Sequence, residues 1–171
     1  IIKMYKEGED YAFIKRHCMH CLDPACVNAC PVSALVKDRE TGVVTYDASA
    51  CIGCRYCQVA CPYNVPKFDW YSPFPQIHKC QLCDHLFEQG RYAACCESCP
   101  TGASLFGPVE KLKKEAERRL LLEPGKYYDF PVNHIQNGNT RRHKAEKYIP
   151  HIYGNEEVGG SQYMILSGTD F

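Results

Sequence analysis

Twelve of the thirteen cysteines in this chain fall into three runs, and each run ends in Cys-Pro. The runs span Cys18–Cys30, Cys51–Cys61 and Cys80–Cys99. The middle run has the spacing C-x2-C-x2-C-x3-C, whereas the first and third begin with C-x2-C and end with C-x3-C after a loop of variable length. At this density and spacing, disulfides or bound metal must dominate how the chain folds.

Three kinds of chemistry use cysteines in such numbers. Disulfides suit small secreted domains, but the odd cysteine count and the adjacent Cys95 and Cys96 argue against them. A zinc-stabilised interaction module would use two C-x2-C pairs for a tetrahedral site. Zinc leaves the later cysteines of each run, and the proline, without a role. Iron–sulfur clusters account for the spacing and the proline together.

The middle run matches the bacterial ferredoxin pattern, in which three cysteines hold one cluster and the fourth binds its neighbour. Such runs therefore work in pairs, a loop-type run with a compact one. The first run can pair with the middle run, but the third has no compact partner in this chain. A compact run upstream of residue 1 would give four 4Fe–4S clusters in the complete protein. If the third run instead closes its own cluster, the total is three.

Pairing assigns ligands, which must be soft thiolates to suit iron and sulfide. The first set is Cys18, Cys21, Cys26 and Cys61. The second set is Cys51, Cys54, Cys57 and Cys30. The third cluster would take Cys80, Cys83 and Cys95, with its fourth ligand upstream. Cys99 would supply one ligand to a fourth cluster, whose other three lie upstream, and Cys96 remains as a small buried thiol.

Composition narrows the function further. The 171 residues carry 20 basic and 20 acidic side chains, so nothing indicates a nucleic-acid partner. No apolar stretch approaches the roughly 20 residues of a membrane-spanning helix, and no signal peptide is visible. Because the chain starts at Ile1 without an initiator Met, we expect it to be a fragment. The aliphatic core is thin, so we expect the apoprotein not to fold.

Local patterns predict an α+β fold of tandem bacterial-ferredoxin-like domains with short hairpins and helices. A strand is expected at 11–14, and a hairpin is expected between 31–36 and 43–47. Residues 63–79 read as an irregular connector with a small aromatic cluster of its own. The members of that cluster are Phe68, Trp70, Tyr71 and Phe74.

The C-terminal third is expected to contain one helix. Pro108 begins it, Val109, Leu112, Ala116 and Leu120 share a face, and Pro124 follows its end, so the helix covers 108–122. Two i,i+4 ion pairs, Glu110–Lys114 and Glu115–Arg119, would support it. Beyond Lys126 the pattern weakens, apart from one possible strand at 161–166.

These elements suggest four segments. Residues 1–79 form a ferredoxin-like module with two complete clusters. Residues 80–107 form half of a second module, completed by an upstream segment. Residues 108–125 contain the helix. Residues 126–171 form an irregular extension that wraps the body or lies on a partner subunit.

The chain resembles the four-cluster ferredoxin-like electron-transfer subunits of respiratory oxidoreductases. Within that family it is most similar to the iron–sulfur subunit of hydrogenase-2-type nickel–iron hydrogenases. The matching stretches are 11–35, 41–69, 78–83, 99–107 and 147–168. The last of these favours the hydrogenase branch over the formate dehydrogenase and dimethyl sulfoxide or polysulfide reductase branches.

The resemblance implies a non-catalytic subunit that relays electrons. One end of the relay is a [NiFe] hydrogenase with its small and large subunits, and the other end is a quinone-reactive integral membrane subunit. It also implies a place in a membrane-bound complex at the periplasmic face of the cytoplasmic membrane. The alternative keeps the clusters but gives the chain a molybdenum or tungsten oxidoreductase as its partner. The family's twin-arginine signal, C-terminal anchor and first cysteine run are not part of this sequence.

Overall fold

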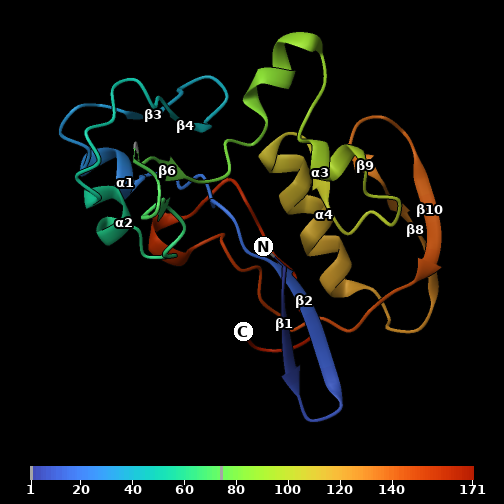
Figure 1. Ribbon diagram of the computed structural model, residues 1–171. Helices are drawn as coiled ribbons and strands as arrows, with labels where there is room; N and C mark the ends of the chain where they lie inside the picture. Colours follow the sequence, from blue (N-terminus) through green and yellow to red (C-terminus); the bar gives the residue numbers. More distant parts are fainter. Residues whose placement is uncertain (1, 74) are drawn as a thin grey trace. The chain divides into compact units, whose positions relative to one another are not determined.

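The computed structural model describes residues 2–73 and 75–171 (Figure 1). The chain divides into two compact units. The first, here the cysteine module, contains residues 15–82 and 154–163. The second, here the helix–hairpin unit, contains residues 2–14, 83–153 and 164–171. In the described part of the chain, no helix has the length and apolarity needed to cross a membrane.

The cysteine module is built from very short elements. They are α1 (Ala25–Asn28), β3 (Leu35–Lys37), β4 (Val44–Tyr46), α2 (Tyr56–Ala60), β5 (Lys67–Phe68), β6 (Ile77–His78) and the 3₁₀ turn η2 (Glu157–Gly159). The strands pair only within hairpins, β3 with β4 and β5 with β6, both antiparallel. Cysteine sulfur is part of the core, because Cys26 and Cys57 are buried together with Leu35, Val44 and Ile77.

The hairpin predicted between the first two cysteine runs is confirmed. Leu35 lies opposite Tyr46 and Lys37 opposite Val44. Asp38 closes the turn, since its carboxylate accepts the backbone N–H groups of Glu40 and Thr41 at 2.8 and 2.7 Å. Each strand has three residues, fewer than predicted over 31–36 and 43–47.

The connector at 63–79 differs from its prediction. It forms the β5–β6 hairpin instead of an irregular segment. Phe68 packs against the core and touches the Trp70 ring at 5.0 Å between centroids. The predicted aromatic cluster is wrong for Tyr71, which is 100% exposed, and Trp70 is itself 61% exposed. These rings are on the surface because the two-residue strands cannot cover them. Phe74 lies outside the described residues.

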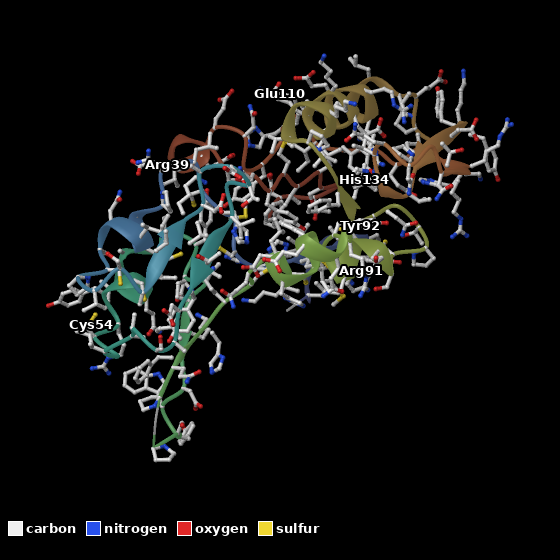
Figure 2. All side chains as sticks on the ribbon, turned by 90° about the horizontal axis from the view of Figure 1, so that it is seen from above. Arg39, Cys54, Arg91, Tyr92, Glu110 and His134 are labelled. Atoms are coloured by element: carbon white, nitrogen blue, oxygen red, sulfur yellow. The ribbon has the colours of Figure 1, made fainter. Side chains whose placement is uncertain are left out.

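The helix–hairpin unit carries the longer elements. They are β1 (Ile2–Glu7), β2 (Asp10–Lys15, whose last residue belongs to the cysteine module), the 3₁₀ helix η1 (Asp84–Gln89), α3 (Ala94–Glu97), β7 (Leu105–Phe106), α4 (Val109–Leu121), β8 (Tyr127–Pro131), β9 (Asn133–His134) and β10 (Thr140–Lys144). The strand predicted at 11–14 is confirmed within β2, which pairs with β1. Tyr92, Phe106 and His134 meet around the parallel β7–β9 pair (Figure 2).

The predicted helix is confirmed as α4. Pro108 does not begin it but precedes it, with an extended ψ of 131°, so the helix starts at Val109. Glu115 forms the expected pair with Arg119 at 2.8 Å and a second pair with Arg118 at 2.7 Å.

The prediction of an irregular extension from residue 126 is wrong over residues 127–144. There β8 and β10 pair antiparallel, with Phe130 opposite Arg141 and Tyr128 opposite His143. Phe130 is 2% exposed and stacks on His143 at 4.1 Å. The possible strand at 161–166 is absent as such, because Ser161 and Ile165 make isolated bridges to Cys21 and Tyr153. The fold is α+β with small sheets, while its tandem ferredoxin arrangement remains a prediction.

Candidate iron–sulfur cluster sites

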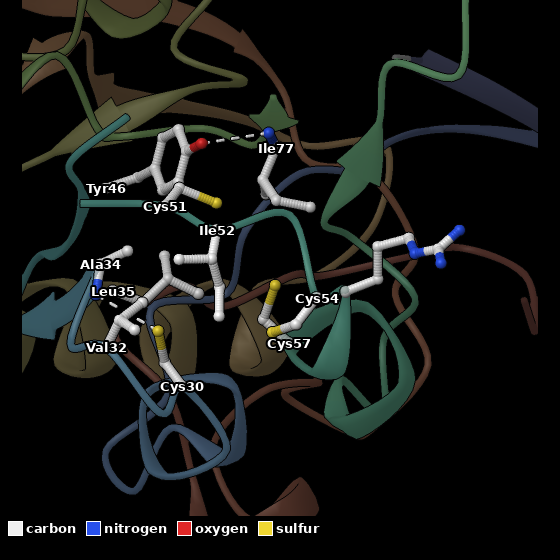
Figure 3. A pocket seen from close by; sticks show the side chains of 11 residues that line it. Cys30, Val32, Ala34, Leu35, Tyr46, Cys51, Ile52, Cys54, Cys57 and Ile77 are labelled. Atoms are coloured by element: carbon white, nitrogen blue, oxygen red, sulfur yellow. Dashed lines mark hydrogen bonds between the residues drawn. The ribbon is translucent and has the colours of Figure 1, made fainter. Parts of the chain in front are cut away.

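The second predicted ligand set surrounds a single cavity. Cys30, Cys51, Cys54 and Cys57 all line it (Figure 3). Cys57 lies on α2, the run's two earlier cysteines precede α2, and Cys30 follows α1. The remaining walls are mainly aliphatic. The structure therefore brings a cysteine of the first run to three cysteines of the middle run.

Backbone donors are directed at the sulfurs of this cavity. The N–H of Ala34 lies 3.2 Å from Cys30 Sγ, and the N–H of Gly53 lies 3.5 Å from Cys51 Sγ. The tight loop requires positive φ at Gly53 (70°) and at Arg55 (67°). Such donors stabilise charged sulfur and lower its electron density, which tunes any iron bound there.

The electrostatic interactions among the thiols connect the same four cysteines that line the cavity. Burial raises the pKa of Cys57, and the neighbouring thiolates Cys54, Cys30 and Cys51 raise it further. These are the other three members of the second set. Thiolates that repel one another in this way can stay ionised together only when a cation neutralises them.

The first set shows the same grouping. Burial raises the pKa of Cys26 to about 11, and charge on Cys18, Cys61 and Cys21 adds to the rise. Cys61 is also the strongest neighbouring charge that raises the pKa of Cys21. The last cysteine of the middle run thus lies within electrostatic reach of three cysteines of the first run, as cross-ligation requires.

The donor sets fit 4Fe–4S clusters. The structure shows no disulfide among the thirteen cysteines, all of which lie within the described residues. Among the described residues, no three His, Cys, Asp or Glu side chains gather closely enough to share one ion. Cluster ligands need not do so, because each cysteine of a 4Fe–4S cluster binds a different iron. Buried and partly buried cysteines in two groups, with N–H donors and aliphatic walls at the second group, suit this cofactor. The residue-by-residue ligand assignment remains a prediction.

The third run is less gathered. Cys80 lies in the cysteine module and Cys83 in the helix–hairpin unit, and Cys95 on α3 is exposed. The spare Cys96 is buried, as predicted. Burial would raise the pKa of Cys99, but hydrogen bonds from the Thr101 hydroxyl and nearby backbone N–H groups lower it to about 7. The predicted ligand set of the third cluster therefore stays a prediction.

Three side chains with a structural role at the cysteine runs were missed by sequence reasoning. Asn133 donates from Nδ2 to the carbonyl oxygens of Cys96, Glu97 and Cys99 at 2.8, 3.0 and 3.0 Å. Lys37 and Lys79 donate to the carbonyl oxygens of Cys21 and Cys80, respectively. Each contact joins segments that are distant in sequence or depends on how a loop turns. No local sequence pattern therefore predicts it.

His20, between Cys18 and Cys21, is 1% exposed. Burial lowers its pKa to about 3, so the ring is neutral. Its Nδ1 accepts the backbone N–H of Val44 at 2.9 Å, which fixes the cysteine loop against β4.

Cysteines of the first two runs gather in two groups, as expected of a protein with a pair of adjacent iron–sulfur clusters. Residues 9–109 match the family of 4Fe–4S dicluster domains, and the chain belongs to that family. Its cofactors are 4Fe–4S clusters, which sets aside disulfides and the zinc-stabilised interaction module.

Particular relatives narrow the comparison. The chain is 49% identical over 170 residues to hydrogenase-2 operon protein HybA of Escherichia coli O157:H7, covering 97% of this chain and 52% of that protein. It is 36% identical over 152 residues to the nitrate-inducible formate dehydrogenase iron–sulfur subunit of E. coli K12, covering 89% and 45%. It is 42% identical over 103 residues to the probable anaerobic dimethyl sulfoxide reductase chain YnfG of E. coli K12, covering 60% and 49%.

The predicted resemblance to the hydrogenase-2 branch and its cousins is confirmed by these matches. The chain spans about half the length of the relatives it matches.

Proposed function

We propose that this chain is a non-catalytic subunit that carries electrons through a series of 4Fe–4S clusters. The observation that supports this best is the gathering of two cross-run cysteine sets within residues 15–82. Because Cys30 and Cys61 each join the other run's set, two clusters bound there would be close neighbours. A bound cluster supplies one-electron transfer, and the protein supplies its position and electrostatics.

The protein's own groups have definite tasks in this role. The N–H groups of Ala34 and Gly53 hold thiolate charge on Cys30 and Cys51. Leu35 and Ile77 line the cavity and exclude water, which keeps the local dielectric low. Both arrangements hold the cysteines in place through electron transfer, so little reorganisation accompanies each step.

The complete protein would contain four clusters. Two would take all their ligands from this chain, the third would use Cys80, Cys83 and Cys95, and the fourth would use Cys99. The missing ligands would come from a compact run upstream. Iron analysis of the full-length protein tests this number, because about sixteen atoms per chain indicate four clusters and about twelve indicate three.

Similarity to HybA over 97% of this chain supports a hydrogenase complex as the setting. Electrons would pass from a [NiFe] hydrogenase, with its small and large subunits, to a quinone-reactive membrane subunit, or in the reverse direction. This transfer would take place at the periplasmic face of the membrane. Similarity to formate dehydrogenase and dimethyl sulfoxide reductase subunits supports the alternative partner, a molybdenum or tungsten enzyme. Nickel or molybdenum in the co-purified complex distinguishes the two.

The test of electron transfer is Cys57→Ala in the full complex, with Cys96→Ala as its control. Both thiols are buried, but only Cys57 lines the cysteine cavity. We expect Cys57→Ala to lose about four iron atoms and to slow hydrogen-dependent quinone reduction. Hydrogen-dependent reduction of an artificial dye at the catalytic subunit should persist. Unchanged quinone reduction in Cys57→Ala, despite iron loss, would contradict the relay.

A further inference from the structure

Lys37 fixes a positive charge beside the first cysteine loop. Its Nζ donates to the carbonyl oxygens of Cys21 and Gly42 at 2.8 and 2.9 Å, and the side chain is half-buried. Two carbonyl acceptors, one in the loop and one at the turn of the β3–β4 hairpin, hold the ammonium in one place. Its charge therefore acts on the first cysteine set from a defined position.

Lys79 also fixes a positive charge, at the first residue of this hairpin's second strand. Its Nζ donates to the carbonyl oxygen of Val44 on β4 and to that of Cys80 at 3.1 Å. The N–H of Val44 donates in turn to His20, between Cys18 and Cys21. Lys79 thus sits on a short hydrogen-bonded path from the third cysteine run to the loop of the first, and it too is half-buried.

Lys37 contacts the backbone of Cys21 directly, and Lys79 reaches the loop of the first set through Val44 and His20. Both ammonium groups therefore lie beside the first set.

The second set has a different electrostatic setting. Arg55 lines the cavity of the second set, but it is exposed and its guanidinium stacks over the Trp70 ring at 4.6 Å. Solvent screens an exposed charge far more than a half-buried one.

We propose that Lys37 and Lys79 raise the reduction potential of the cluster bound by the first set above that of the cluster bound by the second set. The proposal rests on the proposed function. Reduction adds one electron and so makes a cluster more negative, with no bond broken. A fixed positive charge nearby stabilises that reduced state. An electron entering the cysteine module would therefore rest on the first set's cluster, next to Cys80, where Lys79 also faces the third run.

The experiment is an EPR-monitored redox titration of the full-length protein in its complex, with Lys37→Gln and Lys79→Gln. Glutamine keeps an N–H donor for the carbonyl oxygens but removes the charge. Each variant should lower the potential of the same cluster, leave the second set's cluster unchanged, and retain its iron. Lys37→Arg and Lys79→Arg should restore potentials close to the wild type.

Lys67→Gln is the matched control. Lys67 is exposed, and its Nζ donates to the side-chain oxygen of Asn64 at 2.9 Å. It should shift neither potential. Shifts of equal size in both clusters, or no shift with iron intact, would overturn the proposal.

A second measurement does not depend on the lysine variants folding. Cys57→Ala removes a ligand of the second set, so the module signal that persists should be the one of higher potential. Persistence of the lower-potential signal would overturn the inference while leaving the relay intact. A complex with no cluster signal in the wild type would instead refute the proposed function.

Discussion

The cysteine module and the helix–hairpin unit bury different materials. In the module, Cys26 and Cys57 share the core with Leu35, Val44 and Ile77, and the longest helix has five residues. In the helix–hairpin unit, a thirteen-residue helix and a pair of five-residue strands surround the buried ring of Phe130. One unit is organised around sulfur that must bind iron, and the other around ordinary aromatic and aliphatic packing. The two should therefore respond differently to loss of iron.

Iron removal gives the largest expected effect. Chelation under reducing conditions leaves the module with clustered thiols and too few aliphatic side chains, so residues 26–60 should lose protection from amide hydrogen exchange almost completely. In the same sample α4 and the β8–β10 hairpin should stay protected. Hydrogen exchange with mass spectrometry measures both regions at once. Simultaneous loss in both would show that the second core also depends on iron.

Phe130→Ala tests the comparison from the other side. The ring is almost fully buried, stacks on His143, and carries the guanidinium groups of Arg118 and Arg119 within 5.3 Å of its centroid. Its removal should cost about 3–5 kcal/mol of unfolding free energy, measured by denaturant titration of far-UV circular dichroism. Iron content of the module should not change under native conditions.

Tyr127→Ala is the control for this change, since Tyr127 lies on the same strand but is 58% exposed. It should cost less than about 1 kcal/mol. If Phe130→Ala released iron as readily as it unfolded the hairpin, the two cores would be one cooperative unit.

Asn133 is the point where packing of the second unit reaches a cysteine run. Its side chain bonds three carbonyl oxygens around α3, including that of Cys99, and its own φ is +63°. Asn133→Asp replaces the donor with an acceptor that repels those carbonyls. We expect a loss of about 2–3 kcal/mol from broken hydrogen bonds, together with weakening of the EPR signal that depends on Cys99.

Asn133→Gly separates the side chain from the backbone, because glycine tolerates positive φ. This variant should lose the EPR signal that depends on Cys99, while strand β9 stays formed. Asn137→Asp is the matched control, since Asn137 bonds the Val132 carbonyl and none of the α3 carbonyls. An unaltered cluster spectrum in both Asn133 variants would show that the hydrogen bonds of Asn133 have no influence on the third cysteine run.

The parts that could be predicted are those with a local cause. The first hairpin follows from Asp38 and Gly42 at its turn, and α4 follows from its apolar face and the flanking prolines. The 4Fe–4S cofactors follow from the cysteine spacing and the proline after each run, whereas the two ligand sets remain a prediction. Iron chemistry is thus read from sequence more directly than the packing around it.

The parts that could not be predicted depend on contacts made at a distance. Strand β10 exposes all of its residues except His143, so it shows no alternation of buried and exposed positions. Lys79 reaches a carbonyl 35 residues away, and Asn133 reaches one 37 residues away. The exposure of Tyr71 follows from the shortness of β5 and β6, which composition does not reveal.

Glu115→Gln gives the smallest expected effect and tests whether the second unit has a pH response of its own. Burial alone would raise the pKa of Glu115, but hydrogen bonds from Arg118 and Arg119 lower it overall. Because the folded pKa lies below that of an unfolded glutamate, about 4.3, the ionised side chain stabilises α4 above that pH. The contribution is lost as pH falls through the folded pKa.

At pH 7 the variant should therefore lose about 1 kcal/mol of protection in amide exchange along α4, and the difference from wild type should disappear once pH falls below the lowered folded pKa of Glu115. Glu110→Gln, on the first turn of the same helix, is the control and should change protection by a few tenths of a kcal/mol at most, about the size of a helix-end charge effect. A difference that persisted at low pH would mean that Glu115 acts through packing instead of charge. The helix–hairpin unit would then be held by shape alone, and ionised groups would matter for stability only where thiolates meet iron.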